Sequence, residues 1–196
     1  KHHRSKGRVA KLILELNKLP SFNNCDDNDL DSRMVVAPSI DYIEETFNPS
    51  KFDKLSLEPT LEICIKKDSD QNPKLDIQVQ YAPYKTHQGW ENIKESYVKS
   101  IIRIISKYAP NINECIERKK LLTPDDIESE YNVSGGHWHH GEIQIDQLFM
   151  MRPIPGASQY KTHLDGLFMC GAGTHPGGGL TGISGKNAAK AVLDDF

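Results

Sequence analysis

Apolar and polar residues alternate along one stretch in the middle of the chain. Over Leu75–Ala82, the apolar residues Ile77, Val79 and Tyr81 are separated by single polar residues. This period of two is typical of a strand with one buried face. A second apolar run, Leu61–Ile65, precedes it, and the polar residues between the two runs predict a turn or loop. We therefore predict two antiparallel strands within a larger sheet.

A helical period replaces this alternation from Trp90 to Tyr108. Apolar residues recur there at intervals of three and four positions, which places them on one face of a helix. Pro110 predicts the end of the helix, because proline lacks the amide hydrogen that a helix interior needs. The apolar stripe consists of Ile93, Tyr97, Val98, Ile101, Ile102, Ile105 and Tyr108.

Two shorter helices are indicated by their capping residues. Thr123 is a favourable N-cap, Pro124 suits the first helical position, and Asp126 occupies the capping-box position. Ser39 is the expected N-cap of an earlier helix, which follows a short strand predicted over residues 33–38. The residues expected on the apolar face of that earlier helix are Ile40, Ile43 and Phe47.

The chain divides into two segments near Ser134. Residues 1–134 mix strands and helices, so we predict an α+β fold with a mixed or antiparallel sheet. Within them, residues 1–32 are loop-rich: residues 9–20 combine helical and strand spacings, and residues 21–32 are rich in Asn and Asp. The unusual composition follows Val133, and residues 135–196 form the second predicted segment.

Composition and charge argue against several classes of protein. A net charge of −3 and a pI near 6.3 argue against nucleic-acid binding through a basic face. Cys25, Cys64, Cys115 and Cys170 are too widely spaced for a zinc knuckle or a disulfide framework. No apolar run approaches the ~20 residues that a membrane-spanning helix needs, and there is no apolar secretory signal. These features favour a soluble intracellular protein with reduced thiols.

Glycine is concentrated near the C-terminus, between an apolar run and an alanine-rich helix. Leu167–Cys170 is expected to be the end of a buried strand, and the helix is expected to begin near Thr181–Gly185. Glycine permits positive φ and close approach of the backbone to a ligand, and the first amides of a helix lack internal partners. The arrangement favours a ligand-binding loop, although a simple tight connection has the same pattern. The loop glycines are Gly171, Gly173, Gly177, Gly178, Gly179 and Gly182.

Known phosphate-binding fingerprints do not describe this loop. It lacks the GK[ST] of a P-loop, and Pro176 stands where a dinucleotide fingerprint would have its third glycine. Instead, Gly166–Leu193 resembles the C-terminal flavin-binding signature of phytoene-desaturase-like FAD-dependent oxidoreductases. The resemblance covers most of residues 33–194, and its matching segments are residues 37–47, 79–84, 121–131, 135–156 and 160–167.

The resemblance implies a cofactor and the residues that bind it. Such proteins combine a Rossmann-like FAD domain, discontinuous in sequence, with a substrate domain, so residues 135–196 would be the returning FAD segment and FAD the cofactor. The loop would approach the pyrophosphate and ribityl chain, and the start of the last helix would face the pyrimidine edge of the flavin. The implied cofactor-binding residues are Gly171, Ala172, Gly173, Thr174, His175, Pro176, Gly177, Gly178, Gly179, Thr181 and Gly182.

The family's N-terminal GxGxxG unit has no counterpart in this chain. The resemblance therefore implies the C-terminal portion of a longer flavoprotein, inactive when isolated, whose partner is the N-terminal FAD-domain portion of the same protein. The implied reaction transfers electrons between FAD and an organic, apolar substrate, with no catalytic side chain assigned. The alternative is a non-catalytic interaction or regulatory protein that retains the fold. Related proteins imply the cytoplasm for a bacterial protein and the mitochondrial matrix for a eukaryotic one.

A histidine cluster, His137, His139 and His140 with Glu142, offers a different chemistry. Imidazole and carboxylate ligands suit zinc or iron, but the spacing is not that of a helical HExxH site, so we assign no metal. In the resembling family segment, His140 and Glu142 match the pattern, which leaves a role near flavin or substrate, or ordinary packing, open for these two.

Several other side chains have two possible roles each. Arg152 could approach a cofactor phosphate or form a surface ion pair. Trp90, Tyr81 and Tyr84 could line an apolar substrate cleft or belong to the core. Cys170 is expected to be a small buried residue rather than a redox partner.

Overall fold

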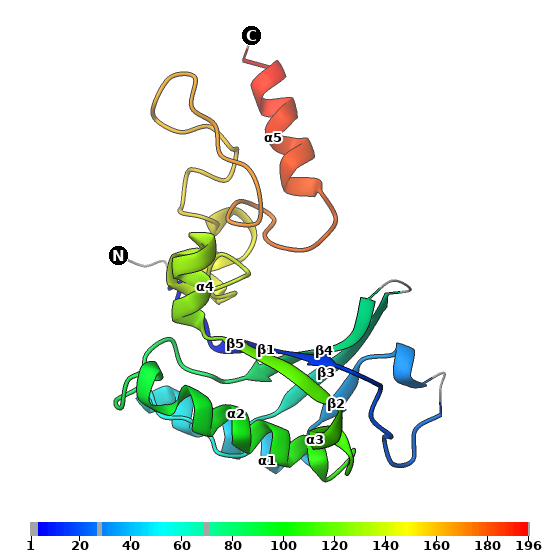
Figure 1. Ribbon diagram of the computed structural model, residues 1–196. Helices are drawn as coiled ribbons and strands as arrows, with labels where there is room; N and C mark the ends of the chain where they lie inside the picture. Colours follow the sequence, from blue (N-terminus) through cyan, green and yellow to red (C-terminus); the bar gives the residue numbers. More distant parts are fainter. Residues whose placement is uncertain (1–3, 27–28, 69–70, 196) are drawn as a thin grey trace.

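A five-stranded antiparallel sheet forms the base of the protein (Figure 1). The computed structural model describes residues 4–26, 29–68 and 71–195. Its strands follow the order β2-β3-β4-β1-β5, and the helices beside them confirm the predicted α+β class. The strands are β1 (Val9–Leu16), β2 (Met34–Val36), β3 (Leu61–Asp68), β4 (Gln71–Gln80) and β5 (Ile116–Leu122).

The two strands predicted from the apolar run Leu61–Ile65 and the alternation over Leu75–Ala82 are confirmed as the antiparallel pair β3 and β4. Ile63 lies opposite Ile77, and both side chains face the core. The strands continue further into the expected turn than predicted, because residues 66 and 74 are still paired. Residues 69 and 70 of that turn lie outside the described part of the chain.

β1 is central to the sheet, although the spacing of its residues leaves the type of this segment open. It pairs with β4 on one side and with β5, which we did not predict, on the other. Ala10, Leu12, Leu14 and Leu16 are fully buried, while the alternate residues face the other side of the sheet. Ile13 occupies one of those alternate positions and hides the period of two.

Helices cover one face of the sheet (Figure 1). The predicted long helix is α2 (Trp90–Ser106), and its fully buried Ile101 and Ile105 share one core cluster with Leu12 and Ile77. Truncating such a side chain to alanine typically costs about 2–5 kcal/mol. The short α3 (Ile112–Cys115) follows α2, and β5 continues directly from it.

The helix expected after Ser39 is α1 (Ile40–Phe47), but only Phe47 of its predicted apolar face is packed against the rest of the protein. Ser39 Oγ accepts a hydrogen bond from the amide of Tyr42 at 3.0 Å, as expected of the N-cap. Ile40, however, is 85 % exposed, whereas Thr46 is buried and its hydroxyl lies 3.1 Å from that of Thr60. Ile40 and Ile43 are therefore exposed, whereas Phe47 packs against Tyr81 with ring centroids 5.1 Å apart. The 3-10 turns η1 (Asp29–Asp31) and η2 (Asn48–Phe52) flank this part of the chain.

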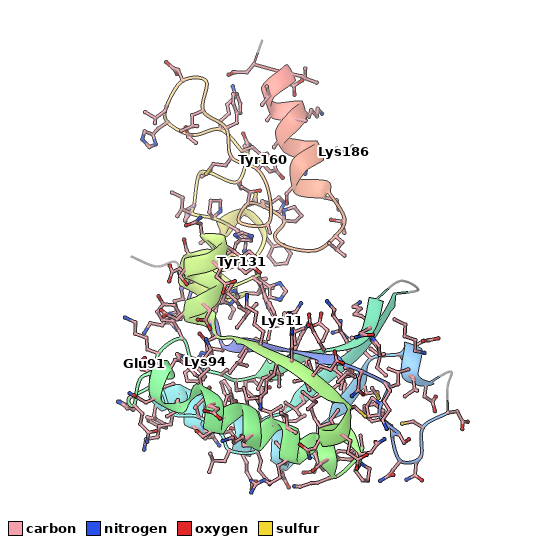
Figure 2. The ribbon with its side chains drawn as sticks, viewed as in Figure 1. Lys11, Glu91, Lys94, Tyr131, Tyr160 and Lys186 are labelled. Atoms are coloured by element: carbon pink, nitrogen blue, oxygen red, sulfur yellow. The ribbon has the colours of Figure 1, made fainter. Side chains whose placement is uncertain are left out.

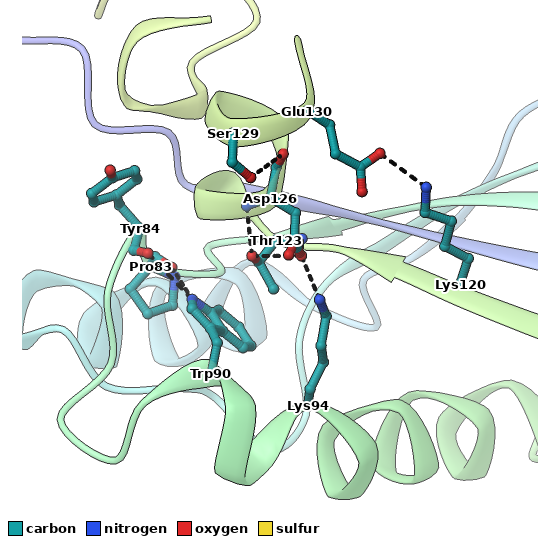
Figure 3. Close-up of polar contacts among 9 residues, drawn as sticks. All are labelled: Pro83, Tyr84, Trp90, Lys94, Lys120, Thr123, Asp126, Ser129 and Glu130. Atoms are coloured by element: carbon teal, nitrogen blue, oxygen red, sulfur yellow. Dashed lines mark hydrogen bonds and ion pairs between the residues drawn. The ribbon is translucent and has the colours of Figure 1, made fainter. Parts of the chain in front are cut away.

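The helix α4 (Pro124–Tyr131) begins with the predicted capping box. Thr123 Oγ1 accepts a hydrogen bond from the amide of Asp126 at 3.1 Å, and Asp126 Oδ2 accepts one from the amide of Thr123 at 2.7 Å (Figure 3). Each side chain thereby satisfies an amide that has no partner within the helix. The expectation for this helix is confirmed.

The C-terminal segment rises from the opposite side of the sheet and ends in α5 (Ile183–Leu193) (Figure 1). Between α4 and α5 it consists of turns, which include η3 (Ser134–Gly136), η4 (Ile145–Gln147) and η5 (Phe149–Met151). The predicted buried strand at Leu167–Cys170 is wrong. A single bridge joins Lys161 to Phe168, and Leu167 is 51 % exposed, because no neighbouring strand among the described residues extends the pairing.

Candidate functional site

The glycine pair Gly135–Gly136 allows close backbone contact between the two segments of the chain. A Cβ on Gly135 would lie 2.0 Å from the carbonyl oxygen of Ser5, and one on Gly136 would lie 1.8 Å from that of Pro124. The amide of Gly7 donates to the carbonyl of Gly135 at 2.7 Å. Backbone therefore packs directly on backbone here, and the N-terminal residues are held beside the C-terminal segment.

The glycines of the C-terminal loop have a different environment. Gly171, Gly177, Gly179 and Gly182 have φ values of 88°, 110°, 131° and 70°, which L side chains rarely adopt. A Cβ on Gly171 or Gly182 would nevertheless meet no protein atom within 4 Å. The loop is therefore shaped by glycine but not filled by the chain's own side chains.

Gly173 and Gly178 lie outside the left-handed region and also have free space. A Cβ on Gly173 would come no closer than 3.9 Å to the Cβ of His140, and one on Gly178 no closer than 3.7 Å to Ala172 and to His139 Nδ1. These are ordinary contacts. Neither strain nor crowding in the described structure requires glycine at these two positions.

Side chains fix the loop from behind. Thr174, which is buried, donates its hydroxyl to the carbonyl of Gly171 at 2.8 Å. The hydroxyl of buried Tyr160 donates to the carbonyl of His175 at 2.6 Å and accepts a hydrogen bond from the side chain of Asn187 at 3.0 Å. Tyr160 thus links the loop to α5, beside which it lies in Figure 2.

Arg152 is the largest fully buried side chain of the C-terminal segment. Only 1 % of it is exposed, and its Nε donates to the carbonyl of Ala172 at 3.2 Å while Nη2 donates to that of His139 at 2.8 Å. Burial lowers the pKa of its guanidinium. Among the described residues it has no carboxylate within ion-pair distance, which rules out the surface ion pair, one of its two predicted roles.

The first turn of α5 begins where the loop ends. Gly182 is its N-cap, and buried Ser184 donates its hydroxyl to the carbonyl of Gly177 at 3.4 Å. The amides of Ser184 and Gly185 have no acceptor in the described part of the chain. The positive end of the helix dipole and two free donors therefore meet at the open side of the loop.

A cavity of about 630 Å³ lies between the base of the C-terminal segment and the helix-free face of the sheet. Lys11 lies on the same face of the sheet and pairs with Asp76 at 2.9 Å (Figure 2). Residues 4, 6–9, 33, 47, 62, 78, 80, 136–139, 142 and 144 line the cavity. No local sequence pattern indicates it, because its walls come from separate stretches of the chain.

The histidine cluster lies between this cavity and the glycine loop. His137 and His139 line the cavity, and their rings are 6.0 Å apart. Burial, followed by the neighbouring His139, lowers the pKa of His137. In residues 4–26, 29–68 and 71–195, no three His, Cys, Asp or Glu side chains meet closely enough to hold a metal ion.

Trp90, Tyr84 and Cys170, which the sequence also singles out, lie in different environments in the fold. Trp90 is a core residue and donates its indole N–H to the carbonyl of Pro83 at 3.2 Å (Figure 3), which rules out the cleft alternative for this side chain. Tyr84 donates to Glu128, which raises the pKa of the phenol to about 12. Cys170 is exposed, so the expectation of a buried thiol is wrong.

Comparison with known proteins shows which proteins the chain is similar to in sequence. The chain is 34 % identical over 163 residues to pyridine nucleotide-disulfide oxidoreductase domain-containing protein 2 of Mus musculus, which covers 79 % of the chain and 28 % of that protein. These proteins are homologues. A limonene dehydrogenase component of Castellaniella defragrans is 34 % identical over 58 % of the chain and 21 % of its own length. A neurosporene-forming phytoene desaturase of Cereibacter sphaeroides is 30 % identical over 53 % of the chain and 19 % of its own length.

One of these relatives is a phytoene desaturase, so the comparisons confirm the resemblance that the glycine loop indicates. No protein-family model matches the chain. The chain spans less than a third of the length of the curated relatives that it matches. Among the described residues, no helix is long and apolar enough to cross a membrane.

Proposed function

We propose that this chain is the C-terminal part of an FAD-dependent oxidoreductase of the phytoene-desaturase-like type. The observation that carries the proposal is the open glycine loop at the start of α5. Space that the chain's own side chains leave free at Gly171, Gly173, Gly178 and Gly182 fits a nucleotide cofactor lying against the backbone. The printed names of the relatives, an oxidoreductase-domain protein, a dehydrogenase component and a desaturase, support the same class.

The groups around the loop match an anionic cofactor. The amides of Ser184 and Gly185 and the positive end of α5 favour negative charge at this position. Buried Arg152 adds a positive charge behind the loop that no described carboxylate neutralises. When bound, FAD would supply the electron transfer between the organic substrate and a second electron carrier. The chain's residues would hold and orient it.

We assign residues 135–196 to a Rossmann-like FAD domain that is completed by an N-terminal portion of the same protein. The exposed apolar side chains of the C-terminal segment support this assignment, because water is an unfavourable environment for so many of them in one segment. Ile145 is 89 % exposed, Phe149 77 % and Leu180 fully exposed. Residues 1–134 would form the substrate-domain segment, and the isolated chain would be inactive.

The reaction would oxidise or reduce an organic substrate with an apolar body. Limonene and phytoene, which appear in the names of two relatives, are hydrocarbons. The cavity on the helix-free face of the sheet is the place we assign to this substrate, because residues of the histidine cluster line it. His139 touches both the cavity and the glycine loop, since it lines the cavity and lies beside Gly178.

Retention of flavin by the full-length protein tests the proposal. The wild type should purify with flavin absorbance, whereas Gly173→Val and Gly178→Val should lose the flavin and keep their circular dichroism spectra. Both positions accept a Cβ within the fold, so a loss would report the occupied space and not unfolding. Ala189→Val, on an exposed turn of α5, adds comparable bulk away from the loop and should retain flavin.

Two results would contradict the proposal. A colourless full-length protein that takes up no added FAD would favour a non-catalytic interaction protein that retains the fold. Flavin retention by both valine variants at the wild-type ratio would show that the cofactor does not lie against this loop.

A further inference from the structure

Three cations of the cavity beside the histidine cluster have no carboxylate partner in the part of the chain that the structure describes. Arg4, Lys6 and Arg8 line it, and among the described residues none of them forms an ion pair. Within the described residues, Arg8 donates to the hydroxyl of Ser50 at 3.3 Å, and its guanidinium lies 5.8 Å from the centre of the Phe47 ring. Three positive side chains thus line one cavity, and no described carboxylate forms an ion pair with any of them.

The carboxylates of the same cavity are engaged by other groups. Glu62 accepts a 2.6 Å hydrogen bond from Arg33 and another of 2.6 Å from the side-chain amide of Gln80. Glu142 accepts a hydrogen bond from the side-chain amide of Gln144. Arg33 and Glu62 cancel in charge, so the remaining cations outnumber the one remaining carboxylate. The cavity therefore carries a net positive charge that an anion would neutralise.

Apolar surface lies beside these cations. Trp138, Phe47 and Val9 also line the cavity, and Trp138 is only partly exposed. A volume of about 630 Å³ is within the range of small-molecule sites in proteins. An occupant that matches both halves of this lining has an apolar body and one anionic group.

The position of the cavity connects it with the proposed flavin loop. His139 lines the cavity, its carbonyl accepts from Arg152, and its Nδ1 lies 3.7 Å from the place of a Cβ on Gly178. His139 would therefore border both a molecule in the cavity and the glycine loop.

We propose that the cavity is the substrate site and that the substrate is an organic anion, an apolar body bearing a carboxylate or phosphate, held at its charged end by Arg4, Lys6 and Arg8. The role of the anion as a substrate rests on the proposed function. The binding of an anion in the cavity does not depend on that function. This substrate differs from limonene and phytoene, the hydrocarbons in the names of two relatives, because a hydrocarbon has no anionic group that could pair with these cations.

Binding of decanoate, decyl phosphate and decanol to the 196-residue chain tests this inference. Trp138 reports on the cavity by its fluorescence, while Trp90, the only other tryptophan, lies in the core. Decanoate or decyl phosphate should change the emission at lower concentration than decanol, and the tighter of the two anions identifies the group. Raising the salt from low to high concentration should weaken the anions and leave decanol unchanged.

A charge-removal variant with a matched control sharpens the test. The double variant Arg4→Gln, Lys6→Gln changes two exposed side chains and should bind the anions about three- to tenfold more weakly, as expected for the loss of exposed charge contacts. The double variant Lys99→Gln, Arg103→Gln removes the same charge from α2, on the other side of the sheet, and should bind as the wild type does. The variant Trp138→Phe should abolish the fluorescence response.

Three outcomes would overturn the inference: equal affinity for decanol and the anions, unchanged anion binding by the Arg4, Lys6 variant, or a response that persists in Trp138→Phe. None of these measurements contains flavin. A failure here would leave the cofactor proposal standing, and loss of the cofactor proposal would leave an anion site of unassigned purpose.

Discussion

Lys94 of α2 donates a 2.6 Å hydrogen bond to Asp126 of α4 (Figure 3). Asp126 Oδ2 also accepts from the amide of Thr123, at 2.7 Å, and from its hydroxyl, at 2.8 Å. One carboxylate oxygen therefore closes the cap of α4 and ties that helix to the helix layer beneath the sheet. Because η3 follows α4 directly, this link also sets the point from which the C-terminal segment departs.

Replacing Asp126 with asparagine should destabilise the protein by about 1–2 kcal/mol, because a charged hydrogen-bond acceptor becomes neutral while its shape is retained. Urea unfolding followed by circular dichroism measures the change. Glu95→Gln is the control, since the Glu95–Lys99 pair is exposed on one helix and its loss should not be measurable. Equal effects of the two substitutions would show that Asp126 contributes no more than a surface pair.

The same carboxylate predicts how stability depends on pH. Burial opposes the ionisation of Asp126, but the hydrogen bonds from Lys94 and Thr123 outweigh it and lower its pKa below the ordinary 3.8. A pKa that is lower in the folded state than in the unfolded state stabilises the fold above the unfolded value and loses this effect as pH falls through the folded one. The free-energy difference between wild type and Asp126→Asn should be constant from neutral pH down to mild acid and shrink below 3.8. A difference that shrinks already near neutral pH would contradict this origin.

Gly136→Ala should be among the most destabilising glycine substitutions in the chain. Its φ is 62°, and the new Cβ would lie 1.8 Å from the backbone oxygen of Pro124, so the loss should be at least about 2 kcal/mol. Gly185→Ala is the contrasting variant, because it lies within α5 with free space around it and should be neutral or stabilise by up to about 1 kcal/mol. Urea midpoints that rank the two in the opposite order would show that the Gly135–Gly136 contact does not hold the segments together.

The sequence predicted those elements whose local pattern agrees with their packing. The stripe of α2, the capping box of α4 and the β3–β4 pair each follow from residues within one short stretch. β5 escaped prediction because residues 117–120 are charged and exposed, and its pairing with β1 depends on a strand about 100 positions away. In α1, the Thr46–Thr60 contact, which no periodicity reveals, decides which face is buried.

The candidate site was predictable only in its glycine loop. The resemblance identified Gly171–Gly182 as a cofactor-binding loop. Gly135 and Gly136 form a similar glycine-rich stretch in the sequence, but glycine is needed there because the backbone of residues 5 and 124 lies too close for a side chain. Arg152 could not be distinguished from a surface arginine, because its partners are backbone carbonyls, which every residue carries. The cavity depends on residues 4–8 meeting residues 136–144, a pairing that only the fold creates.

Arg152→Met should loosen the glycine loop without unfolding the sheet. The methionine would leave the part-buried carbonyls of His139 and Ala172 without their charged donor, and losing a hydrogen bond to a charged group costs about 1–3 kcal/mol. Hydrogen exchange of the amides of residues 171–182 should become faster, while that of β1 and β4 stays unchanged. Arg152→Lys can reach only one of the two carbonyls and should be intermediate, and Arg118→Met on exposed β5 should have no effect. Unchanged exchange in the methionine variant would remove Arg152 from its positioning role.

Cys170 should be the most rapidly alkylated thiol of the 196-residue chain. It is exposed, Cys115 is buried with its thiol donating to the carbonyl of Asn111 at 3.3 Å, and Cys25 and Cys64 are half-buried. Brief treatment with iodoacetamide followed by peptide mass spectrometry should therefore modify Cys170 first and Cys115 only after denaturation. Modification of Cys170 should also leave the unfolding midpoint unchanged, because no core contact is lost. Protection of Cys170 in the native chain would favour the buried strand that the apolar run Leu167–Cys170 predicts, and would place the glycine loop differently from the arrangement described above.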